Sequence, residues 1–403
     1  MTRRASLGTG FWVLTAVLAL LVAPWVWGSG LGRSVISQVG VAVIVCLSYN
    51  VLLGQSGLLS FGHAVFFGAG AFAAIHALRG VAPLPVSLIP LAAGVVALLV
   101  AVPLGWLSTR RGGLAFAMIT LGLGELIWTG AQMFPALFGG EGGLSANRVT
   151  GAGLFGITFG PAIELYYLIA AYTLVCALLL YGLRSTPLGR LLNAVRDNAG
   201  RLGFLGYDAR TVRFLAVLIA AFFAGVAGGL SALLFETVGS EVFSTQRSAA
   251  YLLFTVLGGA GFFMGPVIGA VLMVLSQVLL SELTPAWPLY VGLAFLAVVM
   301  FAPGGLAALL DVWRRPSHRS LAMGYLSLLV CLGVSAVGVA AMVELAYQRQ
   351  LDSAAGAVPF LGAMLDVGSS DSWVGAVLAA LTGAGLFISV RRQLSRSIGE
   401  QAA

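Results

Sequence analysis

Few side chains in the apolar segments of this sequence could take part in chemistry, and Glu125 is the first of them. It lies within an apolar run, five positions after Thr120. An ionised carboxylate at membrane depth is costly unless it is paired or hydrated. Two interpretations stay open: Glu125 faces a polar pathway together with Thr120, or it makes a structural hydrogen bond to a neighbouring helix.

A second group of polar residues lies where two apolar runs meet. Asn50 ends one run, and His63 follows Ser60 at the start of the next. No second histidine, cysteine or carboxylate lies at metal-ligand spacing from His63, so we expect this side chain to cap or pack rather than to bind a metal. The sequence therefore predicts no metal site and no cofactor.

Lysine and cysteine usage excludes further chemistries. All 21 basic residues are arginine, so the chain has no lysine for a nucleotide-binding P-loop or for a Schiff base. Each cysteine lies inside an apolar run, and we expect small buried side chains at Cys46, Cys176 and Cys331. Because no nucleophile and base form a recognisable constellation either, we expect a protein that is not an enzyme.

The composition indicates which elements must position these residues. Of the 403 residues, 60% are apolar and 9% are charged, whereas a soluble domain has about 25% charged residues. About 20 helical residues cross the ~30 Å hydrocarbon core of a bilayer. We expect an all-α, polytopic helical membrane protein with about ten core transmembrane helices and two C-terminal ones. The predicted spans are 11–27, 34–53, 60–78, 85–107, 113–138, 162–183, 212–235, 245–258, 264–283, 286–303, 321–345 and 373–390.

Residues 245–283 allow two arrangements. The run 245–258 begins with polar residues. Glycines lie at its end and directly after it, namely Gly258, Gly259 and Gly261. A broken helix is tolerated at membrane depth only where it is buried in protein or lines a cavity. This part of the chain is predicted to form either two spans or a broken, re-entrant pair.

The arginines orient the chain, because cytoplasmic segments of membrane proteins carry an excess of Lys and Arg. With the N-terminus inside, only five of the 21 arginines fall on the outer side, namely Arg33, Arg79, Arg148, Arg247 and Arg349. Both termini are therefore predicted to be cytoplasmic. The same bias accounts for the net charge of +7, and we expect no binding to nucleic acid.

The longest cytoplasmic connection among the first ten spans is predicted to contain an amphipathic helix. Thr186 can cap it, Pro187 suits its first position and Gly200 can end it. One face is apolar (Leu188, Leu191, Leu192, Val195 and Ala199) and the other polar (Arg190, Asn193, Arg196, Asp197 and Asn198). Such a helix can lie at the lipid interface or dock into a groove of a cytoplasmic partner.

Several motifs occur in an order that resembles a known family. They are Leu47–Phe72, Phe138–Ser145, Gly189–Asn198, Val256–Gly269 and Phe301–Leu306. Together they resemble the permease subunits of branched-chain amino acid ATP-binding cassette (ABC) transporters, in the LivM-like branch. The resemblance covers roughly residues 30–312, and several ordered motifs are more specific than one glycine-rich stretch.

The resemblance implies a permease of an ABC importer in the cell inner membrane, which translocates leucine, isoleucine and valine. It implies a second homologous permease, two cytoplasmic ATP-binding subunits and a periplasmic or lipid-anchored substrate-binding protein as partners, besides the lipid bilayer. The binding protein would dock on outer loops around 139–161 and 236–247.

The resemblance also assigns roles to particular residues. The cytoplasmic helix would couple the chain to the ATPase through Thr186, Pro187, Gly189, Arg190, Arg196, Asp197 and Asn198. The substrate pathway would pass Asn50, Ser60, His63, Thr120, Glu125, Gly258 and Gly259. ATP hydrolysis would be supplied by the separate ATPase subunit.

Alternatives to this function and one departure from the family pattern stay open. Permeases for urea and short amides look much the same, and a proton-coupled secondary transporter would use Glu125 as its proton carrier. We expect the permease domain over residues 1–312 and a C-terminal extension with two further spans over 313–403. The extension either packs on the bundle towards lipid or docks an additional partner.

Overall fold

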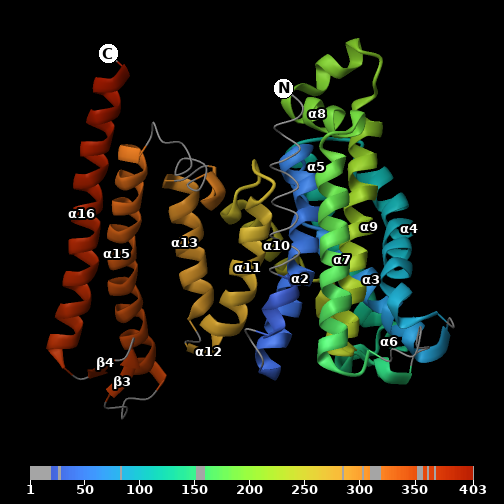
Figure 1. Cartoon of the computed structure of the whole chain (residues 1–403), viewed down its shortest axis with the longest axis horizontal. Coiled ribbons are helices and arrows are strands. Elements are labelled where there is room, and N and C mark those ends of the chain that lie inside the picture. The colour runs from blue at the N-terminus through green and yellow to red at the C-terminus, as the bar shows by residue number, and fades with distance from the viewer. Residues whose placement is uncertain are drawn as a thin grey trace. The chain divides into compact units, whose positions relative to one another are not determined.

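The computed structural model of the chain consists almost entirely of helices (Figure 1). It describes residues 20–25, 29–81, 84–150, 159–283, 286–301, 304–308, 319–351, 357–360, 363–366 and 369–402. The strands of these residues form two sheets of two strands each, so the expected all-α class is confirmed. The chain divides into two compact units, Met1–Leu275 and Ser276–Ala403. The boundary expected at 312/313 lies outside the described residues.

The first unit is built around α9 (Ala209–Phe235). Three helices pack directly against it, namely α2 (Gly30–Asn50), α3 (His63–His76) and α4 (Ile89–Ser108). Helix α7 (Ala162–Leu183) packs on α2, and α5 (Leu114–Met133) lies beside α3 and α4 and is followed by the short α6 (Pro135–Phe138). The buried side of α9 is rich in alanine and glycine, which is typical of helices that associate by close packing in lipid.

Glycine lets the backbones of α3 and α9 approach closely. A Cβ atom at Gly228 would overlap the carbonyl oxygen of Phe67, and one at Gly70 would overlap the backbone of Gly225. Because backbone atoms cannot rotate away as flexible side chains can, these positions accept no larger residue without displacing a helix. Glycine thus permits close packing of the two helices at this contact.

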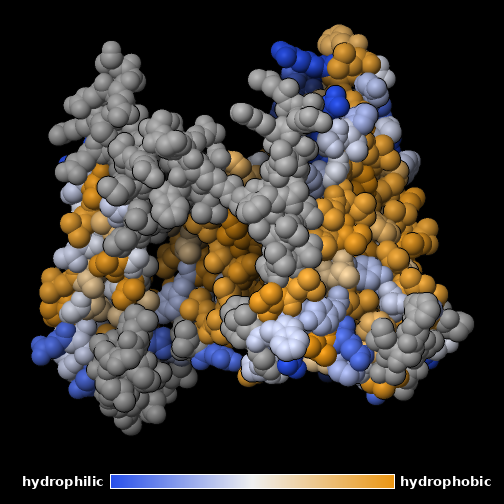
Figure 2. Space-filling view, in the orientation of Figure 1, coloured by the Kyte–Doolittle hydropathy of each residue, from blue (hydrophilic) through white to orange (hydrophobic). Residues whose placement is uncertain are grey.

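Six helices in the described part of the chain are long and apolar enough to cross a membrane. They cover Gly30–Gln55, Val86–Ser108, Leu114–Met133, Ala162–Leu183, Ala209–Phe235 and Ser370–Val390, and shorter apolar helices cover 265–280, 287–300 and 333–347. Large apolar side chains are exposed on the outside of the first unit, for example Leu99 and Leu126. Figure 2 shows this hydrophobic surface, with hydrophilic residues gathered near α8.

The expected span 60–78 differs from the structure at its start. Helix α3 begins at His63, and residues 56–62 form a turn and an irregular segment. This segment follows a π-helical turn, η1 (Val51–Gln55), which extends α2. The difference arises because side chains from other helices bind the backbone of residues 60–64 in place of an additional helical turn. Of the first expected span, 11–27, only the helical residues 20–25 are described.

Helices α10 (Thr245–Gly258) and α11 (Gly265–Leu275) pack on each other and on α2. The 14 residues of α10 rise about 21 Å, which is less than the ~30 Å of a hydrocarbon core. Between the two helices Gly259 has a φ of 113°, in the region that favours glycine. Of the two arrangements expected for 245–283, the geometry favours the broken pair, with its break at residues 259–264.

The second unit contains a tight pair of long helices, α15 (Arg319–Leu351) and α16 (Ser370–Ala402). They run antiparallel and are joined through the hairpin of β3 (Ala357–Phe360) and β4 (Ala363–Asp366). Gly338 lies against the backbone of Ala380, and Gly383 lies against Ser335. The unit also contains α12 (Ser281–Leu283) and α13 (Trp287–Phe301), and the Tyr290 hydroxyl of α13 donates to the Ala340 carbonyl of α15 at 3.3 Å.

Candidate functional site

A buried polar cluster joins the end of α2 to the start of α3. The Ser48 hydroxyl lies 3.0 Å from Nε2 of His63, whose side chain is fully buried. The Tyr49 hydroxyl donates to the Ser60 carbonyl at 2.9 Å and accepts from the Ser60 amide at 3.2 Å. Since the backbone of residue 60 is not helical, these bonds satisfy groups that would otherwise be unpaired at membrane depth.

Two further helices complete this cluster. The Phe61 amide donates to the Thr120 hydroxyl of α5 at 3.2 Å, and the Ala64 amide donates to the Ser248 hydroxyl of α10 at 2.9 Å. Three of the predicted pathway residues, Ser60, His63 and Thr120, therefore lie around one irregular segment. Ser48 and Ser248 belong to the same cluster and were missed in the sequence, because an isolated serine in an apolar run carries no spacing signal.

Glu125 makes a hydrogen bond between helices. The Thr245 hydroxyl at the start of α10 donates to its carboxylate. Thr120 points elsewhere, because its hydroxyl donates to the Ala117 carbonyl at 2.9 Å and accepts from Phe61. The structure therefore does not join Glu125 to Thr120, and it shows the hydrogen bond to a neighbouring helix that was the other interpretation. A place for Glu125 in the substrate pathway stays a prediction.

Asn50 lies beside the break between α10 and α11. Its side chain is 5% exposed, and its Oδ1 atom has no hydrogen-bond partner within the described part of the chain. A Cβ atom at Gly54 would overlap both Oδ1 of Asn50 and the carbonyl oxygen of Ala260 in the break. A Cβ atom at Gly258 would likewise overlap the Gly265 carbonyl. The predicted pathway residues Asn50, Gly258 and Gly259 thus belong to one region where backbones meet closely.

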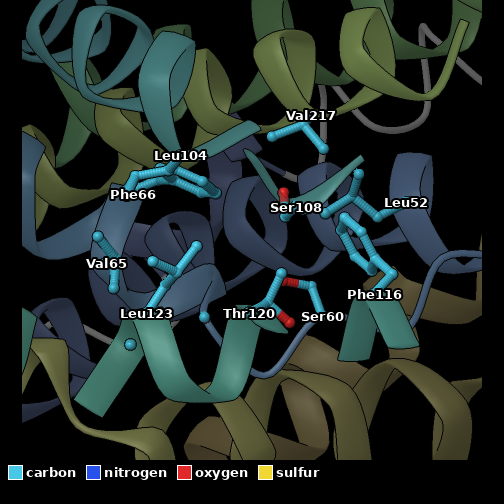
Figure 3. A pocket seen from close by; sticks show the side chains of 12 residues that line it. Leu52, Ser60, Val65, Phe66, Leu104, Ser108, Phe116, Thr120, Leu123 and Val217 are labelled. Atoms are coloured by element: carbon cyan, nitrogen blue, oxygen red, sulfur yellow. The ribbon is translucent and has the colours of Figure 1, made fainter. Parts of the chain in front are cut away.

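A narrow cavity lies between α3, α4, α5 and α9 (Figure 3). The cavity is partly open to the surface. Ser60 and Thr120 lie next to each other on its wall, and Ser108 adds a third hydroxyl group. The other lining residues are Leu52, Gly62, Val65, Phe66, Leu104, Phe116, Leu123, Gly124 and Val217. Such a mainly apolar lining suits an aliphatic group, and it includes two of the seven predicted pathway residues.

The predicted cytoplasmic helix is α8 (Pro187–Phe204). The Thr186 hydroxyl accepts from the Gly189 amide at 3.1 Å and Pro187 is the first helical residue, as expected. A Cβ atom at Gly189 would overlap the Leu183 carbonyl, which explains glycine at this tight turn. The predicted apolar face is buried within the chain at Leu192 and Val195.

The expected end of α8 at Gly200 is wrong. The helix is interrupted at Asn198, with φ −160° and ψ 98°, and helical residues then continue to Phe204. The Asn198 side chain accepts from the amides of Gly200 at 3.0 Å and Arg201 at 3.2 Å. Asparagine therefore starts a second short helical segment here, because its side chain caps free amide groups.

Arg196 does not simply face outward from α8, as its place on the polar face predicted. Its Nη1 atom donates to the Gly54 carbonyl at 2.5 Å, and its Nε atom lies 3.1 Å from Oδ1 of Asp197. Arg190, Asp197 and Asn198 are exposed. The polar face thus includes one arginine that binds the end of α2, the half-buried Asn193, and three residues open to a partner.

The opposite end of the first unit joins the two loops expected to dock a binding protein. Strands β1 (Leu144–Ser145) and β2 (Thr237–Val238) pair antiparallel there. Arg79 donates from Nε to the Ser145 carbonyl at 3.0 Å. Residues 151–158 of the first loop lie outside the described part, so the complete docking surface stays a prediction.

Arg148 holds this end together and was missed as a site residue. Its guanidinium donates to the carbonyls of Phe159 at 2.8 Å, Gly160 at 3.1 Å and Leu233 at 3.2 Å, and lies 3.5 Å from the Glu236 carboxylate. Its amide also donates to Glu236, at 3.0 Å. The signal in the sequence that could have identified Arg148 is its position as a lone arginine in a glycine-rich loop. The sequence does not show which carbonyl groups accept its hydrogen bonds.

Comparison with known families decides the class of this chain. Residues 33–303 match the family described as the permease component of the branched-chain amino acid transport system. The chain belongs to this family. It is 30% identical over 327 residues to the high-affinity branched-chain amino acid transport system permease protein LivM of Escherichia coli, with 74% of this chain and 73% of the relative covered. The protein of the same name from Salmonella typhimurium is 30% identical over 324 residues, with the same shares covered. No solved structure matches the chain significantly.

The family match places the polar cluster, the α10–α11 break and α8 inside the permease, and it ends before α15. This chain is thus a multi-pass membrane permease of a transport system.

Within the described residues, no three His, Cys, Asp or Glu side chains lie close enough to hold a metal ion. Cys46, Cys176 and Cys331 are free and buried, as expected.

We expect Tyr49→Phe to destabilise the permease. The substitution removes the hydroxyl that pairs both backbone groups of Ser60, and leaving buried groups unpaired costs about 1–3 kcal/mol. Thermal unfolding of the detergent-solubilised protein should show a melting temperature lower by several degrees. Tyr207→Phe is the matched control, because Tyr207 is 50% exposed. Equal melting temperatures for the two variants would contradict a structural role of the Tyr49 hydroxyl.

Proposed function

We propose that this permease is a transmembrane subunit of an ABC importer for branched-chain amino acids. The family match carries the proposal, since it extends over the whole first unit from residue 33 and includes α8. The two LivM relatives are named as parts of high-affinity branched-chain amino acid transport systems. The mainly apolar lining of the cavity, with a few hydroxyl groups, has the polarity that an aliphatic side chain requires.

The chain would depend on partners for energy and for substrate capture. Without a lysine it lacks a P-loop, so separate ATP-binding subunits would hydrolyse ATP, and a second permease would complete the pathway. Helix α8 offers Arg190, Asp197 and Asn198 to such an ATPase. A substrate-binding protein would dock at the end held by Arg148 and the β1–β2 pair.

The positions of the arginines support an inner-membrane orientation with cytoplasmic termini. Arg110 and Arg210 both lie over the ring of Trp106, at 4.0 and 5.2 Å from its centre, where α4 ends and α9 begins. Arg79 and Arg148 bind the β1–β2 end instead. These two pairs of arginines, which are assigned to opposite sides of the membrane, thus lie in separate places.

Transport would proceed by alternating access without a covalent step in this chain. ATP binding would favour one arrangement of the helices and hydrolysis would restore the other. The irregular segment 56–62 and the break at 259–264 interrupt the helices of the described bundle, and side chains of α5 and α10 bind the backbone at Phe61 and Ala64.

Uptake by the complete transporter in proteoliposomes tests this function. The four kinds of subunit are reconstituted together, and radiolabelled leucine is offered with the binding protein. We expect uptake that requires ATP on the ATPase side and continues after a proton ionophore is added. Glu125→Gln should retain ATP-driven uptake, because a hydrogen bond between Thr245 and the amide can replace that with the carboxylate.

Two results would contradict the proposal, and each would favour a different function. Transport of urea or acetamide in place of leucine would favour a permease for short amides. Leucine uptake by the purified chain alone under a pH gradient, abolished in Glu125→Gln, would identify a proton-coupled secondary transporter.

A further inference from the structure

One side chain links the cytoplasmic helix to the end of α2. The Nη1 atom of Arg196 donates to the Gly54 carbonyl at 2.5 Å, although the two residues are 142 positions apart. The Arg196 side chain is 42% exposed, so one of its sides is covered by this contact. A hydrogen bond from a charged guanidinium is among the stronger polar contacts, and arginine keeps its charge at any physiological pH.

The chain at 54–57 is shaped to receive this arginine. Gly57 has a φ of 67°, in the left-handed region, and a Cβ atom there would lie 2.8 Å from Cγ and 3.5 Å from Cα of Arg196. A larger residue at this position would push α8 away. Gly54 itself lies in η1, a π-helical turn, and such turns occur frequently at functional sites.

Gly54 also contacts the break between α10 and α11. Its Cα atom faces the Ala260 carbonyl so closely that no Cβ atom would fit, and the Asn50 side chain occupies the same place. Movement of the Gly54 backbone therefore displaces either Asn50 or residue 260. A continuous series of contacts leads from Arg196 through Gly54 to the α10–α11 break.

We propose that Arg196 is a positioning residue that transmits movements of α8 to the end of α2 and to the α10–α11 break. The proposal rests on the proposed function, in which an ATPase moves α8. It distinguishes Arg196, whose guanidinium binds the Gly54 carbonyl within the permease, from the exposed Arg190, which would meet the ATPase. Loss of Arg196 should therefore uncouple ATP hydrolysis from transport without releasing the ATPase.

The complete transporter in proteoliposomes tests this role. Leucine uptake and ATP hydrolysis are measured on the same vesicles for wild type, Arg196→Ala and Arg196→Lys. We expect the number of leucine molecules transported per ATP to fall about tenfold in Arg196→Ala, as for the loss of one charged hydrogen bond. Arg196→Lys retains a charged donor and should restore part of this ratio.

Arg201→Ala is the matched control, because Arg201 is an exposed arginine of α8 that donates no side-chain hydrogen bond within the described residues. Its transport ratio should equal that of wild type. If uptake and ATP hydrolysis decreased in proportion in Arg196→Ala, or if neither changed, Arg196 would be structural or dispensable and the proposal would be wrong. Absence of ATP-driven uptake in wild type would instead overturn the proposed function itself.

Discussion

Arg148→Ala should be the most damaging single substitution at the β1–β2 end of the permease. The variant loses hydrogen bonds to three carbonyl groups and the ion pair with Glu236, and hydrogen bonds to charged groups contribute about 1.5–3 kcal/mol each. Leu233 lies in the last turn of α9, where carbonyls lack helical partners and a cation is favourable.

The backbone around Arg148 makes this loss larger. Among the described residues, Phe159 and Glu236 are the two non-glycine residues with positive φ, 53° and 57°. Such conformations cost on the order of 1–3 kcal/mol and persist only where the surroundings fix them. Arg148 contacts both residues, at the Phe159 carbonyl and the Glu236 carboxylate. Its removal should therefore release both strained positions together.

Thermal unfolding and binding-protein-dependent uptake measure this effect. We expect a melting temperature lower by about 10 °C, given several kcal/mol and about 2–4 °C per kcal/mol, and uptake close to background. Arg148→Lys should recover little, because an ammonium group cannot reproduce the planar fork of donors. Arg349→Ala, at an exposed arginine of the second unit, should behave like wild type. A stable, active Arg148→Ala variant would show that the β1–β2 end holds without this arginine.

Gly228→Val should prevent α3 and α9 from packing. Even a Cβ atom at this position would overlap the Phe67 carbonyl, and valine adds two methyl groups. Overpacking typically costs about 1–3 kcal/mol, and more where backbone atoms rather than side chains must move. We expect the variant to aggregate or to elute as a broad peak in size-exclusion chromatography after extraction in mild detergent.

Gly122→Val is the matched control for this substitution. A Cβ atom at Gly122 has no neighbour within 4 Å, although the residue also lies in a membrane-spanning helix. The control should elute as a single symmetric peak, since the added side chain points into open space. A well-folded Gly228→Val variant, together with normal uptake, would show that α3 and α9 can separate at no cost.

Local patterns in the sequence predicted the elements of this permease well. The helix from Thr186 and Pro187 was predicted because capping and apolar periodicity act over a few residues, and the structure confirms both. Asn198 was read as part of the polar face, whereas its competing property, capping of free amides, interrupts the helix.

Contacts between distant segments were not predictable from one sequence. Glu125 and Thr245 are 120 positions apart, and Ala64 and Ser248 are 184 apart. Each bond depends on how entire helices pack, and one polar residue in an apolar run does not name its partner. Ser60, His63 and Thr120 were recognised as polar residues at membrane depth, but the irregular segment that unites them appeared only in the fold.

Helices α15 and α16 are longer than the bilayer is thick, so part of the pair lies outside the hydrocarbon core. Each helix has 33 residues and extends about 50 Å, whereas the hydrocarbon core is about 30 Å thick. Some 20 Å of this antiparallel pair must therefore lie in the headgroup region or in water. Because α16 continues past its apolar segment through Arg391, Arg392 and Arg396, this excess belongs to the end that carries the C-terminus. The second unit would then extend a basic helical segment beyond the hydrocarbon core.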